Sequence, residues 1–227
     1  MSTFAARAYR FYLQLARPKV PRGVKVMNPY EDKRVRGYLR AFLDAYFDDT
    51  RARTLVFGIN PGRLGAGITG VTFTDPVALA DFCGIPNHMP RKREPSSVFI
   101  YDFIHSMGGP AAFYRAFFLS ALCPLGFTRG ENNLNYYDDP RLARAVTPFI
   151  VRSIERHLEF GGRSDAVVII GAGTNLRFFE ALNEEHRFFA RVLSVEHPRF
   201  IQQYRYKTRD QYLLKYKEVF STATATD

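Results

Sequence analysis

Cysteine and metal-spaced histidine are both scarce in this sequence. The chain has two cysteines, Cys83 and Cys123, so it cannot supply a four-cysteine iron–sulfur cluster or a four-cysteine zinc site. Both lie in apolar segments, which favours buried, reduced thiols in a cytosolic protein. The five histidines show no metal-ligand spacing. We therefore expect neither a metal nor a cofactor.

Long apolar runs are also missing. No stretch approaches the length of a membrane span, and the amino-terminal residues lack the apolar core and cleavage site of a signal peptide. No internal repeat is present, and the chain is long enough to bury one sizeable core. We expect a single domain over residues 1–220, a flexible tail at residues 221–227, and a cytoplasmic location without membrane contact.

Acidic residues are outnumbered by basic ones. The chain has 32 Lys and Arg against 22 Asp and Glu, which gives a net charge of +10. This excess favours a polyanionic partner, either nucleic acid or a membrane surface, although a basic protein without such a partner remains an alternative. The run Arg91-Lys92-Arg93 lies in a proline-bounded loop, where it either contacts phosphates or is simply solvated.

Four short apolar segments have the character of buried strands. They are separated by segments with helical periodicity, and this alternation predicts a parallel sheet covered by helices on both faces. The predicted fold is therefore α/β, a three-layer α/β/α sandwich around a mainly parallel four-stranded sheet. The predicted strands are residues 54–57, 117–123, 166–170 and 191–195. The main predicted helices are residues 4–16, 31–47, 76–84, 97–107, 140–161, 174–186 and 208–220, with caps at Asp75, Ser97 and Thr208 and a restart or kink at Pro148.

A glycine-rich stretch at residues 57–73 follows the first predicted strand. It carries five glycines within thirteen residues, so its backbone can approach a ligand closely. A loop that leaves a parallel strand lies at the carboxyl edge of the sheet, where α/β proteins bind ligands. A long connecting turn is the alternative, because Asn-Pro-Gly is itself a turn sequence. We favour the ligand site because the loop is long and ends in Phe73.

The other strand ends carry polar residues as well. Asn133 lies in a polar loop after the second strand, and His197 directly follows the fourth strand and precedes Pro198. Loops at the carboxyl ends of parallel strands converge, so we expect these residues and Asn60 to share one crevice. The third strand leads into Gly171-Ala172-Gly173, which invites a nucleotide-binding interpretation. Leu176 replaces the third glycine of that pattern, and the P-loop, H-E-x-x-H and G-x-S-x-G motifs are absent.

These segments resemble one known family. The motifs are similar to those of the uracil-DNA glycosylase superfamily, and most similar to the branch of single-strand-selective monofunctional uracil-DNA glycosylases. The resemblance covers about residues 25–205 and indicates a divergent, bacterial-type member with the uracil-DNA glycosylase-like fold. The matching segments are Gly58-Ile59-Asn60-Pro61-Gly62, Thr69-Gly70-Val71-Thr72-Phe73, Cys123-Pro124-Leu125, Asn133-Leu134 and His197-Pro198.

The resemblance implies two catalytic residues. Asn60 would place the water that attacks the sugar C1′, along a dissociative path because an amide is a poor general base. His197 would stabilise the negative charge that develops on the uracil O2 as the glycosidic bond breaks.

The resemblance also implies a pocket for the extruded base. Phe73 would stack on the base, and the Asn133 amide would read its Watson–Crick edge. Gly62 would lie beside C5, where the absence of a side chain permits 5-substituted bases such as 5-hydroxymethyluracil. The backbone amides of Ile59 and Phe73 would add further contacts to the base.

The sequence departs from the family pattern at two places. After His197-Pro198 the family continues S-P-R-N, but this chain has Arg199, Phe200, Ile201 and Gln202. We expect Pro198, Arg199 and Phe200 to contact DNA, with Arg199 or Phe200 as the wedge that fills the vacated stack. Arg63-Leu64 also replaces the family's P-F. The mismatch-specific uracil/thymine branch shares G-I-N-P-G but lacks the second-motif histidine, so His197 argues for the single-strand-selective branch.

The resemblance implies a monofunctional DNA glycosylase that removes uracil, and it leaves related deaminated bases open. Its partner would be single- or double-stranded DNA, contacted through Arg91, Lys92 and Arg93 as well. We expect a monomer associated with the nucleoid in the bacterial cytoplasm. Three alternatives remain: a non-catalytic nucleic-acid-binding protein on the same scaffold, a mismatch-specific uracil/thymine glycosylase-like enzyme, and a nucleotide-binding enzyme that uses the Gly171 turn.

Overall fold

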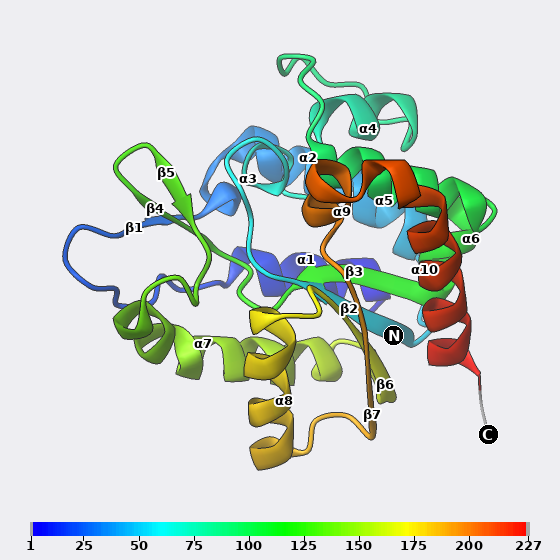
Figure 1. The fold of residues 1–227 in the computed structure, drawn as a ribbon. Coiled ribbons are helices and arrows are strands. Elements are labelled where there is room, and N and C mark those ends of the chain that lie inside the picture. Colours follow the sequence, from blue (N-terminus) through cyan, green and yellow to red (C-terminus); the bar gives the residue numbers. More distant parts are fainter. Residues whose placement is uncertain (1, 226–227) are drawn as a thin grey trace.

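A four-stranded parallel sheet forms the centre of the protein. The computed structural model describes residues 2–225, and the strands lie in the order β3-β2-β6-β7 (Figure 1). All three strand pairings are parallel, as predicted. The first two strands match their predicted cores, and β6 begins four residues before the predicted start at 166 and pairs there with β2. The strands are β2 (Arg53–Gly58), β3 (Phe117–Ala121), β6 (Gly162–Ile170) and β7 (Arg191–Val195).

Alternating side chains of the sheet meet helices on both faces. Phe117 packs on Phe220 with ring centroids 5.0 Å apart, whereas its neighbour Phe118 packs on Phe160 at 5.6 Å on the opposite face. Successive side chains of a strand point to opposite faces, so a strand buried on both sides is apolar throughout. The predicted three-layer α/β/α arrangement is therefore confirmed.

The helices form the two outer layers, as Figure 1 shows. Helices α5 (Pro95–Ser106), α6 (Gly109–Ala116), α9 (Pro198–Tyr204) and α10 (Arg209–Thr224) lie on one side of the sheet. Helices α7 (Pro140–Glu159) and α8 (Thr174–His186) lie on the other. The remaining helical elements are α1 (Phe4–Leu13), η1 (Pro29–Glu31), α2 (Lys33–Phe47), α3 (Ala66–Thr69), α4 (Pro76–Asp81) and η2 (Tyr206–Thr208), and α1 packs on α2.

A second, antiparallel sheet stands beside the carboxyl edge of the first and was not predicted. It has the order β1-β4-β5, with β1 at Lys25–Met27, β4 at Gly126–Arg129 and β5 at Asn132–Leu134. None of these three strands is among the predicted ones, and the polar loop expected around Asn133 is in fact β5. Strands of three or four residues, partly polar, lack the alternation and β-branched content by which strands are identified.

Several helix ends differ from the prediction. Glu94, rather than Ser97, caps α5, because its carboxylate accepts a hydrogen bond from the Ser97 amide at 3.0 Å. Thr208 does precede α10, but its side chain makes no capping bond, so the predicted capping box is absent. The same helix continues to Thr224 and buries Ala223, so residues 221–224 are not a flexible tail. Residues 226–227 of that predicted tail lie outside the described part of the chain.

The segments around two prolines are also more helical than predicted. Helix α7 runs uninterrupted through Pro148, so no new helix begins there. Its buried residues recur at helical spacing on both sides of the proline, and this burial outweighs the one hydrogen bond that proline cannot make. The residues after His197 were expected to form a loop, but Pro198 begins α9, a position that suits its fixed φ.

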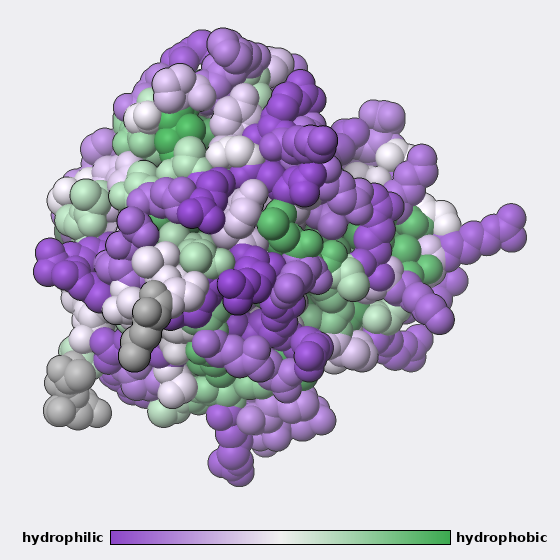
Figure 2. Space-filling view, turned by 180° about the vertical axis from the view of Figure 1, so that it is seen from behind, coloured by the Kyte–Doolittle hydropathy of each residue, from purple (hydrophilic) through white to green (hydrophobic). Residues whose placement is uncertain are grey.

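The exterior is largely polar. On the face turned away from the viewer in Figure 1, hydrophilic side chains cover most of the surface and hydrophobic ones form small separate patches (Figure 2). Both cysteines are buried, as predicted, and burial raises the pKa of the Cys83 thiol to about 11. In the described part of the chain, no helix is long and apolar enough to cross a bilayer.

Candidate active site

A cavity of about 380 Å³ opens at the carboxyl edge of the parallel sheet. Its walls come from the loop after β2, from the start of α5, from β5 and the loop after it, and from His197 and α9. The structure thus brings Asn60, Asn133 and His197 together, as the sequence analysis expected. The Gly171 turn does not line the cavity. The other predicted base-binding residues, Ile59, Gly62 and Phe73, do line it.

Asn60 is held by the backbone that follows β5. Its Nδ2 donates to the Leu134 carbonyl at 3.1 Å, and its Oδ1 accepts from the Tyr136 amide at 3.0 Å. A carbonyl accepts only and a backbone N–H donates only, so these two bonds fix which end of the side-chain amide is oxygen. Oδ1 keeps a second lone pair for another donor.

His197 is presented by the first turn of α9. Its Nδ1 accepts a hydrogen bond from the Arg199 amide at 3.2 Å, and in the neutral ring the proton then resides on Nε2. Burial, with a smaller effect of the Arg199 charge, lowers the pKa of His197 to about 4. The imidazole is therefore neutral at pH 7 and offers one N–H donor.

Phe73 has an unusual backbone for a bulky residue. Its φ is +54°, in the left-handed region that side chains seldom adopt. The ring lies against Gly58, where an added Cβ would be only 2.7 Å from the Phe73 Cζ. It also faces the His197 ring, with centroids 5.8 Å apart. Strain of this kind persists where the surrounding structure imposes it, and it is concentrated at functional sites.

Gly62 and Asn133 are neighbours across the cavity wall. A Cβ built on Gly62 would lie 3.7 Å from the Asn133 Nδ2, which is an ordinary contact. Asn133 is exposed on β5, and among the described residues its side chain has no hydrogen-bond partner. The Asn133 amide is therefore available to a ligand, and the space beside Gly62 is open.

Two glycines let the motif loop pack tightly. A Cβ on Gly67 would lie 2.5 Å from the Gly62 carbonyl oxygen. A Cβ on Gly126 would lie 2.6 Å from the Pro61 carbonyl oxygen. The Gly67 amide donates to the Gly62 carbonyl at 2.9 Å. The pairing of β2 with β3 also extends beyond the ends of these two strands, because the Cys123 amide donates to the Ile59 carbonyl at 3.1 Å. These backbone contacts position Asn60.

The predicted DNA-contacting residues fall into two groups. Arg199 and Phe200 are exposed and line the cavity, whereas Pro198 is buried beneath them. The exposed residues Arg91, Lys92 and Arg93 do not line it. They directly precede cavity residues 94–96, and Arg91 is paired with Asp81 at 2.8 Å.

Other cavity residues were missed by the sequence analysis. Glu94 lines the cavity, but both of its carboxylate oxygens are bound, one by the Ser97 amide and one by the Ser96 hydroxyl at 3.0 Å. The acidic residue before Pro95 is a capping signal that could have revealed it. Tyr137 and Tyr204 also line the cavity. Tyr204 follows Phe200 by four residues, a helical spacing that would have become visible had α9 been recognised.

The Gly171 turn supports the site from behind instead of binding a nucleotide. The buried Asn175 folds back into the turn, where its Nδ2 donates to the Ile170 carbonyl at 3.1 Å. Its Oδ1 accepts from the hydroxyl of the buried Tyr136 at 2.8 Å. Tyr136 is the residue whose amide holds Asn60. The Asn175 side chain also packs on the turn itself, because a Cβ built on Gly171 would lie 3.2 Å from the Asn175 Cβ.

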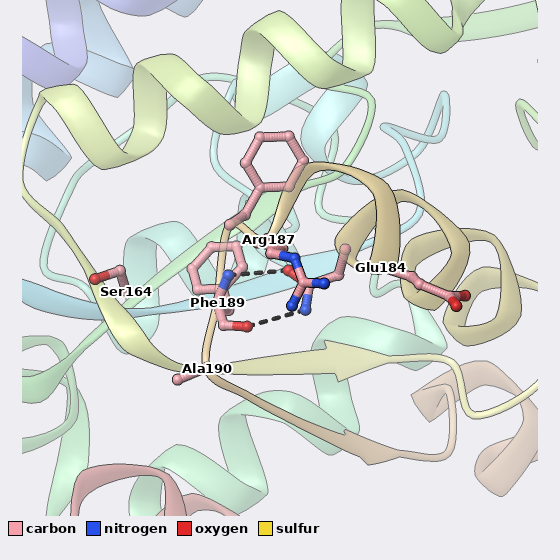
Figure 3. Close-up of a pocket in the computed structure, with 7 residues that line it drawn as sticks. Ser164, Glu184, Arg187, Phe189 and Ala190 are labelled. Atoms are coloured by element: carbon pink, nitrogen blue, oxygen red, sulfur yellow. Dashed lines mark hydrogen bonds between the residues drawn. The ribbon is translucent and has the colours of Figure 1, made fainter.

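A second cavity, of about 520 Å³, lies at the opposite edge of the sheet (Figure 3). It is formed around the chain between α8 and β7 and includes Ser164, Arg187 and Phe189. Asn183 closes this loop by two hydrogen bonds with the Phe189 backbone, of 2.9 and 3.0 Å. None of the predicted site residues lines this cavity. Nowhere in residues 2–225 do three or more His, Cys, Asp or Glu gather in a group that could hold a metal ion.

Comparison with known proteins agrees with the motif geometry. A family model described as the Uracil DNA glycosylase superfamily matches residues 45–221. The chain belongs to this superfamily. It is similar to the crystal structure of wild-type SMUG2 from Pedobacter heparinus, with 40% sequence identity, a TM-score of 0.95 and coverage of 98% of both chains. No match was found among curated proteins. The predicted family and its bacterial, single-strand-selective-type branch are confirmed.

Proposed function

We propose that this protein is a monofunctional DNA glycosylase that extrudes uracil from DNA and hydrolyses its N-glycosidic bond, which begins base excision repair. The observation that carries the proposal is that Asn60 and a neutral His197 line one cavity of about 380 Å³, and both lie within the residues that the superfamily model matches. The enzyme would act as a monomer on chromosomal DNA in the bacterial cytoplasm, and its net charge of +10 favours phosphate contacts.

Recognition of the base would use three cavity residues. Phe73 stacks on the extruded ring, and the free Asn133 amide donates to O4 while it accepts from N3–H. Cytosine presents the reversed pair of groups, so an amide held in this orientation would pair with neither of them. The open space beside Gly62 accommodates a substituent at C5, which extends the proposed substrates to 5-hydroxymethyluracil.

His197 would act when the bond between C1′ and N1 breaks. The electron pair of that bond passes to the base, and negative charge develops on O2. The Nε2–H donates a hydrogen bond that strengthens as this charge grows, which lowers the barrier by differential binding of the transition state. A pKa of about 4 keeps the ring neutral, so the donor is the Nε2–H of a neutral imidazole.

Asn60 would place the attacking water. Its Oδ1 is oriented by the Tyr136 amide and can accept one further hydrogen bond, from the water that adds to C1′. The water's oxygen forms the new bond to C1′, and its proton leaves to solvent or to the departing base. The carboxylate of Glu94 is occupied at the start of α5, so we assign it no part as general base. The path is therefore dissociative, with an oxocarbenium-like sugar.

The described cavity residues include no lysine, and this supports a monofunctional enzyme. A lysine amine would be needed to form the Schiff base that leads to strand cleavage. The product would accordingly be an intact strand with an abasic site.

The test is base release from single- and double-stranded oligonucleotides that carry one uracil, followed by alkaline cleavage of abasic sites. Wild type, Asn60→Ala and His197→Ala would be compared, with His88→Ala as an exposed histidine control. We expect release by wild type and by the control, and a loss of about 100-fold or more in the two site variants.

Two outcomes would contradict the proposal. Release that survives both site substitutions would retain the enzyme class but remove these residues from the mechanism. No release of any base tested, together with salt-dependent DNA binding, would support the non-catalytic nucleic-acid-binding alternative.

A further inference from the structure

Three large hydrophobic side chains are unusually exposed at the mouth of the cavity. Phe200 is 39% exposed, Tyr204 67% and Tyr206 60%, and we call these three the aromatic face. They account for half of the exposed large hydrophobic residues in the described chain, and all three fall within seven consecutive residues. Scattered exposed hydrophobic residues need no explanation, but a cluster beside a binding site indicates an interaction surface.

The aromatic face leads outward from the cavity. Phe200 and Tyr204 are one helical turn apart on α9, with ring centroids 5.7 Å apart, and both line the cavity. Tyr206 lies just beyond, in η2, and does not line the cavity. The aromatic face therefore begins in the cavity with Phe200 and Tyr204 and continues along the chain into η2.

Positive charge accompanies these rings. Residues 199–209 include four basic side chains and no acidic one. The guanidinium of Arg205 lies 5.3 Å from the centre of the Phe200 ring, and that of Arg209 lies 5.7 Å from the centre of the Tyr206 ring. Arg209 is also paired with Asp102, whereas Arg199 and Arg205 make no ion pair in the described structure.

Aromatic rings interleaved with arginines are the features that bind single-stranded nucleic acid. Bases stack on the rings, and the cations neutralise the phosphates between them. In a duplex the bases next to the target remain stacked on each other, so they cannot use such a surface without being unstacked. The charge complementarity, together with continuity with the cavity, selects a DNA strand over an apolar protein partner.

We propose that the aromatic face binds unpaired nucleotides adjacent to the extruded base, on one side of it, and thereby favours single-stranded substrates. This inference rests on the proposed glycosylase function for its substrate. It differs from a wedge in the duplex, because Tyr204 and Tyr206 would stack on flanking bases instead of filling the vacated position.

The test compares Tyr206→Ala and the Tyr204→Ala/Tyr206→Ala double variant with Tyr206→Phe, which retains the ring. Leu214→Ala removes a side chain of similar exposure (66%) on α10 and serves as the matched control. Binding of a uracil-free single-stranded oligonucleotide is measured by fluorescence anisotropy. Release is measured on uracil in single strands and in duplexes.

We expect the double variant to bind the single strand about 5- to 100-fold more weakly, whereas Tyr206→Phe and Leu214→Ala bind as wild type. Its kcat/KM should fall by a similar factor on single strands and change less than about twofold on duplexes. Abasic spacers placed next to uracil should reproduce the loss on one side of the base only. Equal losses on single strands and duplexes, or unchanged binding by the double variant, would overturn the inference.

The two proposals can fail separately. If wild type releases no uracil but the double variant loses single-strand binding, the aromatic face stands and the glycosylase function fails. If wild type releases uracil and the double variant binds single strands as wild type does, the function stands and the aromatic face is wrong.

Discussion

The two sheets of this protein differ in almost every physical respect. The parallel sheet β3-β2-β6-β7 is apolar and largely buried, with helices on both faces, and it delivers Asn60 and His197. The antiparallel sheet β1-β4-β5 has short, partly polar and only partly buried strands, and it delivers Asn133. The residues proposed for bond breaking therefore lie within two residues of the ends of parallel strands, and the Asn133 amide proposed for base reading lies on the more accessible sheet.

This difference indicates how selectivity and chemistry can vary independently. Geometry of about half an ångström matters for catalysis, and residues supported by a packed sheet are held more precisely than those on loops. A base-reading amide tolerates more adjustment and can be replaced without disturbing the core. Four predictions test this division. Two concern the parallel sheet and the residues packed on it or following it, and two concern the antiparallel sheet and the contact at its tip.

The largest effect is expected for His197→Ala. Loss of the Nε2–H donor should lower kcat about 100- to 1,000-fold with little change in KM, because the bond strengthens only in the transition state. Single-turnover release from uracil-containing DNA measures this loss. The wild-type rate should also stay level as pH falls from 7 to 5, since His197 gains its proton only near its pKa of about 4. An inflection near pH 6.5 would show that the ring titrates as an exposed histidine does.

The second prediction concerns His157, which is wholly buried beneath the parallel sheet. Its Nδ1–H donates to the Ser153 carbonyl at 2.6 Å, and its Nε2 accepts from the Ser120 hydroxyl at 2.7 Å. Burial lowers the pKa of His157 from 6.5 to about 4, so the unfolded chain binds more protons between these values. Stability supplied by the neutral ring is complete above pH 6.5 and is lost as pH falls toward 4.

Urea unfolding at pH 7 and pH 4.5 measures this loss. His157 should account for a decrease of about 2–3 kcal/mol in the free energy of unfolding. His157→Phe should lower the stability at pH 7, because it removes the buried hydrogen bond that the Ser120 hydroxyl donates to the ring, but it should make the protein less sensitive to acid. The exposed His88→Ala serves as control and should retain the wild-type sensitivity. Equal acid sensitivity of His157→Phe and wild type would contradict the prediction.

On the antiparallel sheet, Asn133→Ala should reduce kcat/KM for uracil about 5- to 100-fold, the value of one well-placed bidentate contact to a base. The melting temperature should stay within about 1 °C, because Asn133 is exposed and substitutions at such sites change stability little. Asn133→Asp should lose a similar factor, since a carboxylate cannot donate to O4. A melting temperature that falls with activity would mean that Asn133 supports the fold instead of reading the base.

The smallest effect is expected for Arg63→Ala. Arg63 joins the motif loop to Glu131 at the tip of the antiparallel sheet at 3.2 Å, but the Glu131 side chain is 95% exposed. Such pairs contribute about 0.2–1 kcal/mol, so thermal unfolding and uracil release should change little. Glu131→Gln should behave in the same way. A large loss in either variant would show that the ion pair, and not the backbone contacts around Asn60, connects the two regions.

The parallel sheet could be predicted from the sequence, whereas the antiparallel sheet could not. The reason is burial, because strands covered on both faces are continuously apolar and strands that are only partly covered are not. A run such as Ala166–Ile170 has no polar residue to satisfy and many β-branched side chains, so it identifies itself as a buried strand. In Asn132–Leu134 nothing local specifies a strand. That strand exists because of its pairing with β4, a tertiary interaction that no periodicity records.

The cavity residues that belong to sequence motifs could be predicted. The buried residues that hold them in place through packing and hydrogen bonds could not. Asn60, Phe73 and His197 could be named because each follows a strand or closes a distinctive motif. Tyr136 and Asn175 support Asn60 through buried hydrogen bonds between segments far apart in sequence, and neither carries a local signal of that role. Of the aromatic face, Phe200 was predicted to contact DNA, but Tyr204 and Tyr206 were not. Without a predicted helix at α9, the four-residue spacing of Phe200 and Tyr204 had no structural meaning.

The close packing of Gly67 and Gly126 against the motif backbone has a consequence for how this enzyme can be altered. Because Asn60 is positioned by main-chain contacts, the exposed side chains of Arg63 and Leu64 are free to diverge, and the departure from the family's P-F at these positions needs no compensation. A library intended to change base preference can randomise Gly62, Arg63, Leu64 and Asn133 together. It should leave Gly67 and Gly126 untouched, since any side chain there would displace the loop that carries Asn60.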